Sequence, residues 1–180
     1  MWHVEVKDWE KVNDTLYNIF LSESEKRLKE VIDESEKITN RAYSVINILI
    51  PVITLIIGFL LSRIDMKPDY KMFGATLFLI PLLYSFYQFI SLVKKREIYR
   101  NGTEPSEIFL SKYVDDERLE ENEKSKRILL FIIEQNQEKI RLNEESNNIR
   151  IQKYQYSIGT LFVAFILFIV IIVLKTIFLQ

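Results

Sequence analysis

Side chains suited to catalysis are scarce in this 180-residue chain, which contains one histidine and no cysteine. His3 is the only imidazole, and its apolar neighbours Trp2 and Val4 do not supply the partners that general-base chemistry needs. An RNase that uses an arginine a few residues before a histidine is unsupported, because no arginine precedes His3. Without thiols, disulfides, iron–sulfur clusters and thiolate zinc sites are excluded. We therefore expect no enzyme, no catalytic residue, no cofactor and no metal site.

Two groups of carboxylates resemble metal ligands at first sight. They are Asp115-Asp116-Glu117 and Glu120-Glu121, and both lie among lysines and arginines. Carboxylates interleaved with basic residues are typical of a solvated helical face. This interpretation is favoured over a metal site.

Seven basic residues are candidates for binding an anion. The first cluster directly follows an apolar block, where membrane topology alone predicts positive charge. Combined with a second cluster it would make a pocket for the phosphates of a nucleotide or of an anionic lipid, although the spacing matches no known phosphate motif. The residues are Lys94, Lys95, Arg96 and Arg100 in the first cluster, and Lys124, Lys126 and Arg127 in the second. The formal net charge of −1 adds no general attraction to nucleic acid.

A stripe of small and polar residues follows one helical face of the charge-free segment Ala42 to Ser62. Its members recur every third or fourth position: Ser44, Asn47, Pro51, Thr54, Gly58 and Ser62. Lipid cannot satisfy hydroxyl and amide groups, so the stripe must face another helix or water. The pair Gly58-x-x-x-Ser62 favours close helix packing, whereas the amide of Asn47 favours a symmetric interface or a conduction path. A packing seam and a pore wall both remain open.

A second polar stripe lies in the next apolar segment, beyond Pro81. Tyr84, Gln88 and Ser91 are spaced four and three residues apart, so they share one helical face. This stripe too could face a neighbouring helix or water.

The elements that carry these stripes are predicted to be membrane helices. Apolar residues make up 48% of the chain and charged residues 27%, and the two kinds are segregated along it. Three charge-free blocks, Ala42 to Ser62, Met72 to Val93 and Tyr154 to Leu174, each have the roughly 20 residues that cross a bilayer. We expect an all-α membrane protein with three transmembrane helices and long cytoplasmic helices. Its segments are a cytoplasmic region (1–41), a transmembrane hairpin (42–93), a second cytoplasmic region (94–153), and a third transmembrane helix with a short tail (154–180).

Basic residues predict the orientation. The clusters that flank the blocks favour a cytoplasmic N-terminus and place the C-terminus outside a bacterial inner membrane. The short link from Arg63 to Lys71 would then lie outside, although it carries three basic residues. The flanking residues are Lys37, Arg41, Lys94, Lys95, Arg96, Arg100, Arg150 and Lys153.

The regions outside the blocks are predicted to be mostly helical. A helix is expected from Asp8, and a second one from the capping box of Ser22 and Glu25. Residues 2–7 could form a short strand, Asn101-Gly102 a turn, and Thr103 to Ser106 the start of a helix. No proline or glycine interrupts residues 106–158, which allows one very long helix or two.

Two heptad registers fit this long segment, and the sequence does not choose between them. One is half polar and reads Leu129, Ile133, Asn136, Ile140, Asn143, Asn147, Arg150 and Tyr154. The competing one reads Ile128, Ile132, Gln135, Lys139, Leu142, Ser146 and Ile149. Asparagine at core positions can fix the register and the oligomer number, or line a hydrated bundle.

One architectural resemblance adds to this interpretation. The run Trp9-Glu10-Lys11-Val12-Asn13-Asp14, a charged helix leading into a membrane hairpin, and a Lys/Glu/Asn-rich helix entering a last membrane helix resemble small bacterial anti-phage membrane effectors. These effectors accompany nucleotide-signalling enzymes in the Pycsar, CBASS and Hailong systems. The resemblance implies an oligomeric membrane channel or membrane-disrupting effector controlled by a nucleotide messenger from a companion enzyme, and it assigns no binding residue. We expect the oligomer to be formed by copies of this chain. The alternative is a membrane-anchored helical scaffold that recruits a partner and conducts nothing.

Overall fold

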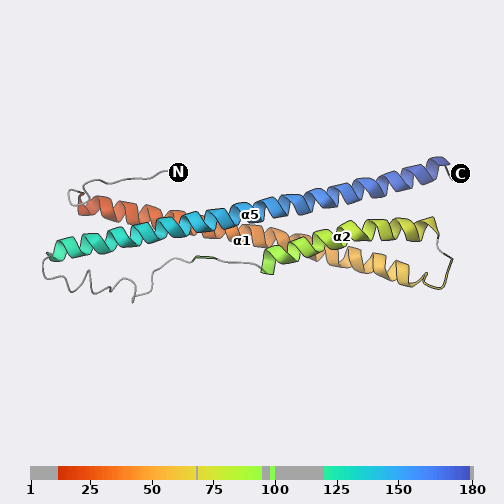
Figure 1. The fold of residues 1–180 in the computed structure, drawn as a ribbon, viewed down its shortest axis with the longest axis horizontal. Helices are drawn as coiled ribbons and strands as arrows, with labels where there is room; N and C mark the ends of the chain where they lie inside the picture. Colours follow the sequence, from red (N-terminus) through yellow and green to blue (C-terminus); the bar gives the residue numbers. More distant parts are fainter. Residues whose placement is uncertain (1–11, 68, 95–97, 100–119, 179–180) are drawn as a thin grey trace. The chain divides into compact units, whose positions relative to one another are not determined.

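The described part of the chain consists of helices and short connections, and it contains no strand. The computed structural model describes residues 12–67, 69–94, 98–99 and 120–178. Its elements are α1 (Asp14–Leu61), α2 (Tyr70–Lys94) and α5 (Glu121–Phe178) (Figure 1). Each of the three contains a stretch long and apolar enough to cross a membrane. The expected all-α membrane protein with three membrane-crossing helices is confirmed.

Helix α1 is a single helix of 48 residues. Asn13 caps it, because its Oδ1 accepts a hydrogen bond of 3.0 Å from the backbone N–H of Thr15. The prediction that a new helix starts at Ser22 is wrong: Ser22 to Glu25 lie inside α1, where nothing before them breaks the helix. The predictions for residues 2–8 and 101–106 lie outside the described residues.

The chain divides into two compact units, and both long helices contribute to each. Unit 1 comprises Met1–Glu34 and Ile98–Glu145, and unit 2 comprises Ser35–Glu97 and Ser146–Gln180. A helix can pass from one unit into the other because neither α1 nor α5 is interrupted.

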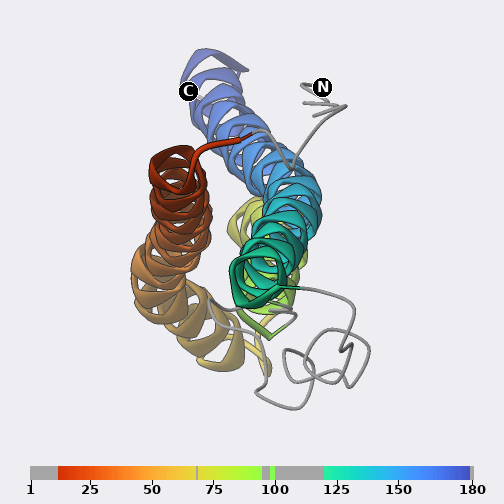
Figure 2. The ribbon, with the colours of Figure 1, turned by 90° about the vertical axis from the view of Figure 1, so that its left-hand side faces the viewer.

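In unit 1, α1 and α5 run parallel. The contacts advance together along both helices, from Asp14–Lys126 (3.3 Å) through Ser24–Asn136 (3.1 Å) to Arg27–Glu144 (2.7 Å). The ribbon is seen in Figure 2 from the end at which these two helices begin. Leu28 and Val31 are the fully buried apolar residues of α1 in this unit, so they form the part of the α1 surface from which water is excluded.

In unit 2, α2 runs antiparallel to α5. The rings of Phe78 and Phe168 are 4.9 Å apart, and those of Phe89 and Tyr154 are 5.6 Å apart in an edge-to-face arrangement. The core of this unit is Ala42, Leu49, Ile53, Leu82, Phe89 and Leu92. Because α2 begins beside the last turns of α5, the link between α1 and α2 and the end of α5 lie at the same end of unit 2.

Asp69 closes this link. Its Oδ1 accepts a hydrogen bond of 2.9 Å from the backbone N–H of Met72, in the first turn of α2, and its Oδ2 lies 3.0 Å from Nη1 of Arg63. The backbone hydrogen bond from Met72 and the charge of Arg63 hold the pKa of the Asp69 carboxyl below its usual range. The link is therefore a capped turn with a fixed ion pair.

The buried residues of α5 follow the half-polar heptad register. Asn136, Asn143, Asn147 and Arg150 are all buried, and the remaining members of this register are half-buried. No member of the competing register is buried. The spacing of seven continues to the buried residues Ser157 and Ala164. The structure thus decides a choice that the sequence left open.

Candidate functional site

The α1 stripe faces away from the core of unit 2. Asn47 precedes the buried Leu49 by two residues, and two residues correspond to about 200° around a helix. All six members of the stripe are exposed in the single chain: Ser44, Asn47, Pro51, Thr54, Gly58 and Ser62. The stripe is therefore not a packing seam against the other described helices of the same chain.

The hydroxyl groups of the stripe are satisfied within α1 itself. Ser44 donates to the carbonyl of Asn40 at 3.0 Å, and Thr54 donates to the carbonyl of Ile50 at 2.8 Å. Ser62 donates in the same way to the carbonyl of Phe59 at 2.8 Å. Hydroxyls bonded back to their own helix tolerate lipid, so they do not require a partner.

Asn47 differs from these hydroxyl residues. Within the described residues its exposed carboxamide makes no hydrogen bond. An amide in hydrocarbon without a partner costs free energy, and membrane proteins relieve this cost with a neighbouring helix or with water. Asn47 is the member of the stripe whose side chain requires a hydrogen-bond partner that the described residues do not supply.

Gly58 leaves room for close approach on the same face. A Cβ built at Gly58 meets no atom within 4 Å. A second helix could therefore approach the backbone here more closely than at a larger residue.

The α2 stripe lies beside the packed face of α2, whose buried residues include Ser85 and Phe89. Tyr84 is 54% exposed and Gln88 is half-buried, and neither side chain makes a hydrogen bond within the described residues. Ser91 donates to the carbonyl of Gln88 at 2.7 Å. As on the α1 stripe, a hydroxyl group that is hydrogen-bonded within its own helix lies next to polar side chains that make no hydrogen bond within the described residues.

The membrane stretch of α5 provides the contrast. From Phe162 to Val170 every residue except the buried Ala164 is exposed, and none carries a polar side chain. An apolar exposed surface of this kind suits lipid, since it contains no group that lipid would leave unsatisfied.

The candidate anion-binding residues are only partly gathered by the structure. Lys126 pairs with Asp14 at 3.3 Å, and Lys124 and Arg127 are half-buried near it on α5 in unit 1. Lys94 is exposed in the last turn of α2 in unit 2. Lys95, Arg96 and Arg100 lie outside the described residues. A common pocket for all seven stays a prediction.

The described residues contain no group of three or more His, Cys, Asp or Glu side chains that could hold a metal ion. Glu120 and Glu121 are exposed at the start of α5, whereas Asp115 to Glu117 lie outside the described part of the chain. Another exposed carboxylate of α5, Glu138, is paired with a basic neighbour. The hydrogen bond of 2.6 Å that it accepts from Arg141 lowers the pKa of its carboxyl group.

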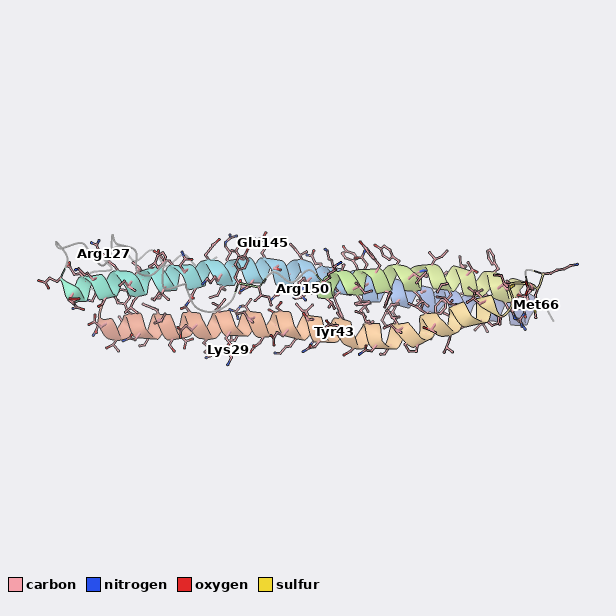
Figure 3. The ribbon with its side chains drawn as sticks, turned by 90° about the horizontal axis from the view of Figure 1, so that it is seen from below. Lys29, Tyr43, Met66, Arg127, Glu145 and Arg150 are labelled. Carbon is pink, nitrogen blue, oxygen red and sulfur yellow. The ribbon has the colours of Figure 1, made fainter. Side chains whose placement is uncertain are left out.

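Arg150 was expected as a flanking charge and as a member of the half-polar heptad register, but the cluster of polar groups around it was not predicted from the sequence. Arg150 is 5% exposed, and its guanidinium reaches Ser35 and Thr39 of α1 and the carbonyl of Leu92 in α2. Arg150 is labelled in Figure 3, which draws the side chains. The signal that could have revealed this cluster is the seven-residue spacing from Asn136 through Asn143 to Arg150.

Comparisons with protein-family models, with curated proteins and with solved structures each found no match to this chain.

Proposed function

We propose that the chain is a subunit of a homo-oligomeric membrane channel, with the α1 stripe facing other copies or the conducting path. One observation carries the proposal: the carboxamide of Asn47 is exposed in a membrane-crossing helix, opposite the chain's own core, and makes no hydrogen bond within the described residues. A carboxamide both donates and accepts, so the same residue of another copy is a complementary partner. Water along a conducting path would satisfy the group equally well.

The distribution of exposed polar groups supports an arrangement within the channel. The α1 stripe and Tyr84 of the α2 stripe present exposed polar side chains, whereas the exposed surface of α5 from Phe162 to Val170 is apolar. In this arrangement α1 and α2 lie nearer the axis and α5 lies toward lipid. The basic residues outside the spans favour a bacterial inner membrane with the N-terminus in the cytoplasm and the C-terminus outside.

Control by a nucleotide messenger is part of the proposal. It rests on the resemblance to the effectors of nucleotide-signalling defence systems and on the basic residues of unit 1. Lys126 is already paired with Asp14, so a bound phosphate would compete with that carboxylate. Replacing Lys126 and Arg127 together by glutamine should weaken binding of cyclic mono- and dinucleotides, and unchanged binding would remove this part of the proposal.

Ion flux from liposomes that contain the purified protein tests conduction. Asn47→Leu removes the amide while keeping the helix apolar, and it should change the flux strongly. Thr54→Val is the matched control on the same stripe, because the Thr54 hydroxyl is already bonded within α1. Flux from Asn47→Leu equal to that of the unmodified chain would show that the stripe does not line the path.

Cross-linking tests self-association independently of flux. The chain contains no cysteine, so a single introduced thiol is the only reactive one. Asn47→Cys should give cross-linked dimers in membranes, whereas Leu49→Cys should not, because Leu49 is 5% exposed and faces the core of its own chain. A chain that stays monomeric in both cases contradicts a homo-oligomeric channel.

A second candidate function is a membrane-anchored scaffold, which one observation favours. Leu16, Ile19 and Phe20 are between 44% and 50% exposed in unit 1 and share a face of α1 outside the membrane stretches. An exposed apolar face in this region could recruit a partner protein. Absence of flux together with retained self-association would favour the scaffold over the channel.

A further inference from the structure

Arg150 is the only charged residue that is buried among those that the structure describes. Nη1 donates to the hydroxyl of Ser35 and to its carbonyl, the latter at 3.3 Å. Nη2 donates to the hydroxyl of Thr39 at 2.7 Å and to the carbonyl of Leu92 at 3.3 Å. One side chain of α5 thus binds both of the other helices of unit 2.

The contact with Leu92 acts on the end of α2. This helix ends at Lys94, so the carbonyl of Leu92 is one of the last four, which have no N–H partner within the helix. A guanidinium at this position satisfies the carbonyl and places positive charge at the negative end of the helix dipole. The cap of α2 is therefore supplied by a different helix.

The shape of the guanidinium suits this role. Its planar fork directs several N–H groups outward at fixed angles, so the two terminal nitrogens can bind α1 and α2 at the same time. A lysine ammonium is a compact point charge on a flexible stem, and it does not reproduce this fixed fork.

We propose that Arg150 is the coupling residue through which displacement of α5 reaches the last turn of α2. Helix α5 runs without interruption from Glu121 to Phe178, so a shift or rotation that begins near Asn136 is carried along the helix to Arg150. Packed helices change state through shifts of this kind, of about 1–2 Å. When Arg150 leaves Leu92, the last turn of α2 loses its cap and frays.

Hydrogen exchange of residues 88–94, measured by mass spectrometry on the purified full-length chain, tests this coupling. Arg150→Met should accelerate exchange there about ten-fold, because several hydrogen bonds of the guanidinium are lost. Arg150→Lys should restore little of the protection. Arg141→Met is the matched control: Arg141 lies on the same helix, but it is exposed and paired with Glu138 and Glu145.

A cross-link that restrains α5 tests whether Arg150 passes displacement of α5 to the last turn of α2, or only packs against that turn. Ser24→Cys and Asn136→Cys place two thiols where the native side chains lie 3.1 Å apart, and a short bis-maleimide can join them. Joining them should slow exchange at residues 88–94 when Arg150 is present, and should leave exchange unchanged in the Arg150→Met background. A merely structural arginine would not produce this dependence.

Two outcomes overturn the proposal. One is unchanged exchange at residues 88–94 in Arg150→Met, and the other is an equal effect of the cross-linker with and without Arg150. If Arg150→Met does not fold, the double variant Ser35→Ala/Thr39→Val carries the test, since it removes two acceptors and keeps the arginine. Faster exchange in that variant supports the proposal, and unchanged exchange overturns it. None of these readouts depends on conduction.

Discussion

The carboxamide of Asn143 binds both polar groups of the Tyr99 backbone. The N–H of Tyr99 donates to Oδ1 at 3.0 Å, and Nδ2 of Asn143 donates to the carbonyl of Tyr99 at 2.9 Å. Asn143 is 3% exposed and Tyr99 is 41% exposed, so the two hydrogen bonds are partly buried. The backbone of Tyr99 is thereby held against α5 in unit 1.

This contact predicts local protection of Tyr99. Asn143→Ala removes two hydrogen bonds worth about 1 kcal/mol each, so amide exchange at Tyr99 should accelerate by at least ten-fold. Asn148→Ala is the control, because Asn148 is exposed on the same helix. Slow exchange at Tyr99 in Asn143→Ala would show that other contacts hold this segment.

Asn136 is predicted to fix the alignment of α5 along α1, and to add little to the thermal stability of the protein. Asn136→Leu replaces a buried amide with an apolar side chain, and Ser24 stays satisfied because its hydroxyl also bonds the carbonyl of Leu21 at 2.8 Å. The Tm should stay level or rise by a few degrees, while α1 and α5 should slip more easily. Cysteines at Asp14 and Lys126 should then cross-link less efficiently than with Asn136 present. A lowered Tm with unchanged cross-linking would contradict this role.

Leu28 is predicted to be a main contributor to the stability of unit 1. It is 0% exposed, so Leu28→Ala should lower the free energy of unfolding by about 2–5 kcal/mol. Leu16→Ala removes the same atoms from a side chain that is 44% exposed, and should cost well under about 1 kcal/mol. Denaturant titration of the detergent-solubilised chain, followed by circular dichroism, compares the two. Equal losses would place the Leu16 face in an interface that the single chain does not contain.

A substitution at Gly58 tests whether this glycine lies in an interface between copies of the chain. A Cβ at Gly58 or at Gly159 meets no atom within 4 Å, so a side chain can begin at either position without a clash at its first atom. Gly58→Leu should reduce self-association, because only Gly58 lies on the α1 stripe, whereas Gly159→Leu should not. The measurement is the oligomer distribution from single-molecule photobleaching. Wild-type distributions for both variants would locate the interface elsewhere.

Asp69 predicts a pH dependence of the link between α1 and α2. Its pKa is lower in the folded chain than in the unfolded one, so the ionised carboxylate stabilises the link above about pH 4. This contribution is lost as the pH falls through the folded-state pKa. Carboxyl NMR titration should give a depressed pKa for Asp69, and the depression should shrink in Arg63→Gln. An ordinary pKa in the unmodified chain would show that the cap and the ion pair do not form.

The sequence alone predicted the class of the fold and the position of the polar stripes. Three charge-free stretches of about 20 residues leave little choice except membrane helices, since only helices or closed barrels satisfy their backbone in lipid. Helical periodicity placed Asn47 and Gly58 on one face, because that spacing depends on residue number alone. The capping box at Ser22 failed because such a signal does not stop a helix that is already running.

Only the tertiary structure decided which faces are covered. The sequence could not tell whether the Asn47 face packs within the chain, because this depends on where α2 and α5 lie. Arg150 shows the same limit more sharply, since its acceptors on α1 lie 115 and 111 residues earlier in the chain. A charge flanking a membrane helix normally faces water, and burial becomes tolerable only when distant oxygens converge on it. That convergence is a property of the packed helices, and no local spacing encodes it.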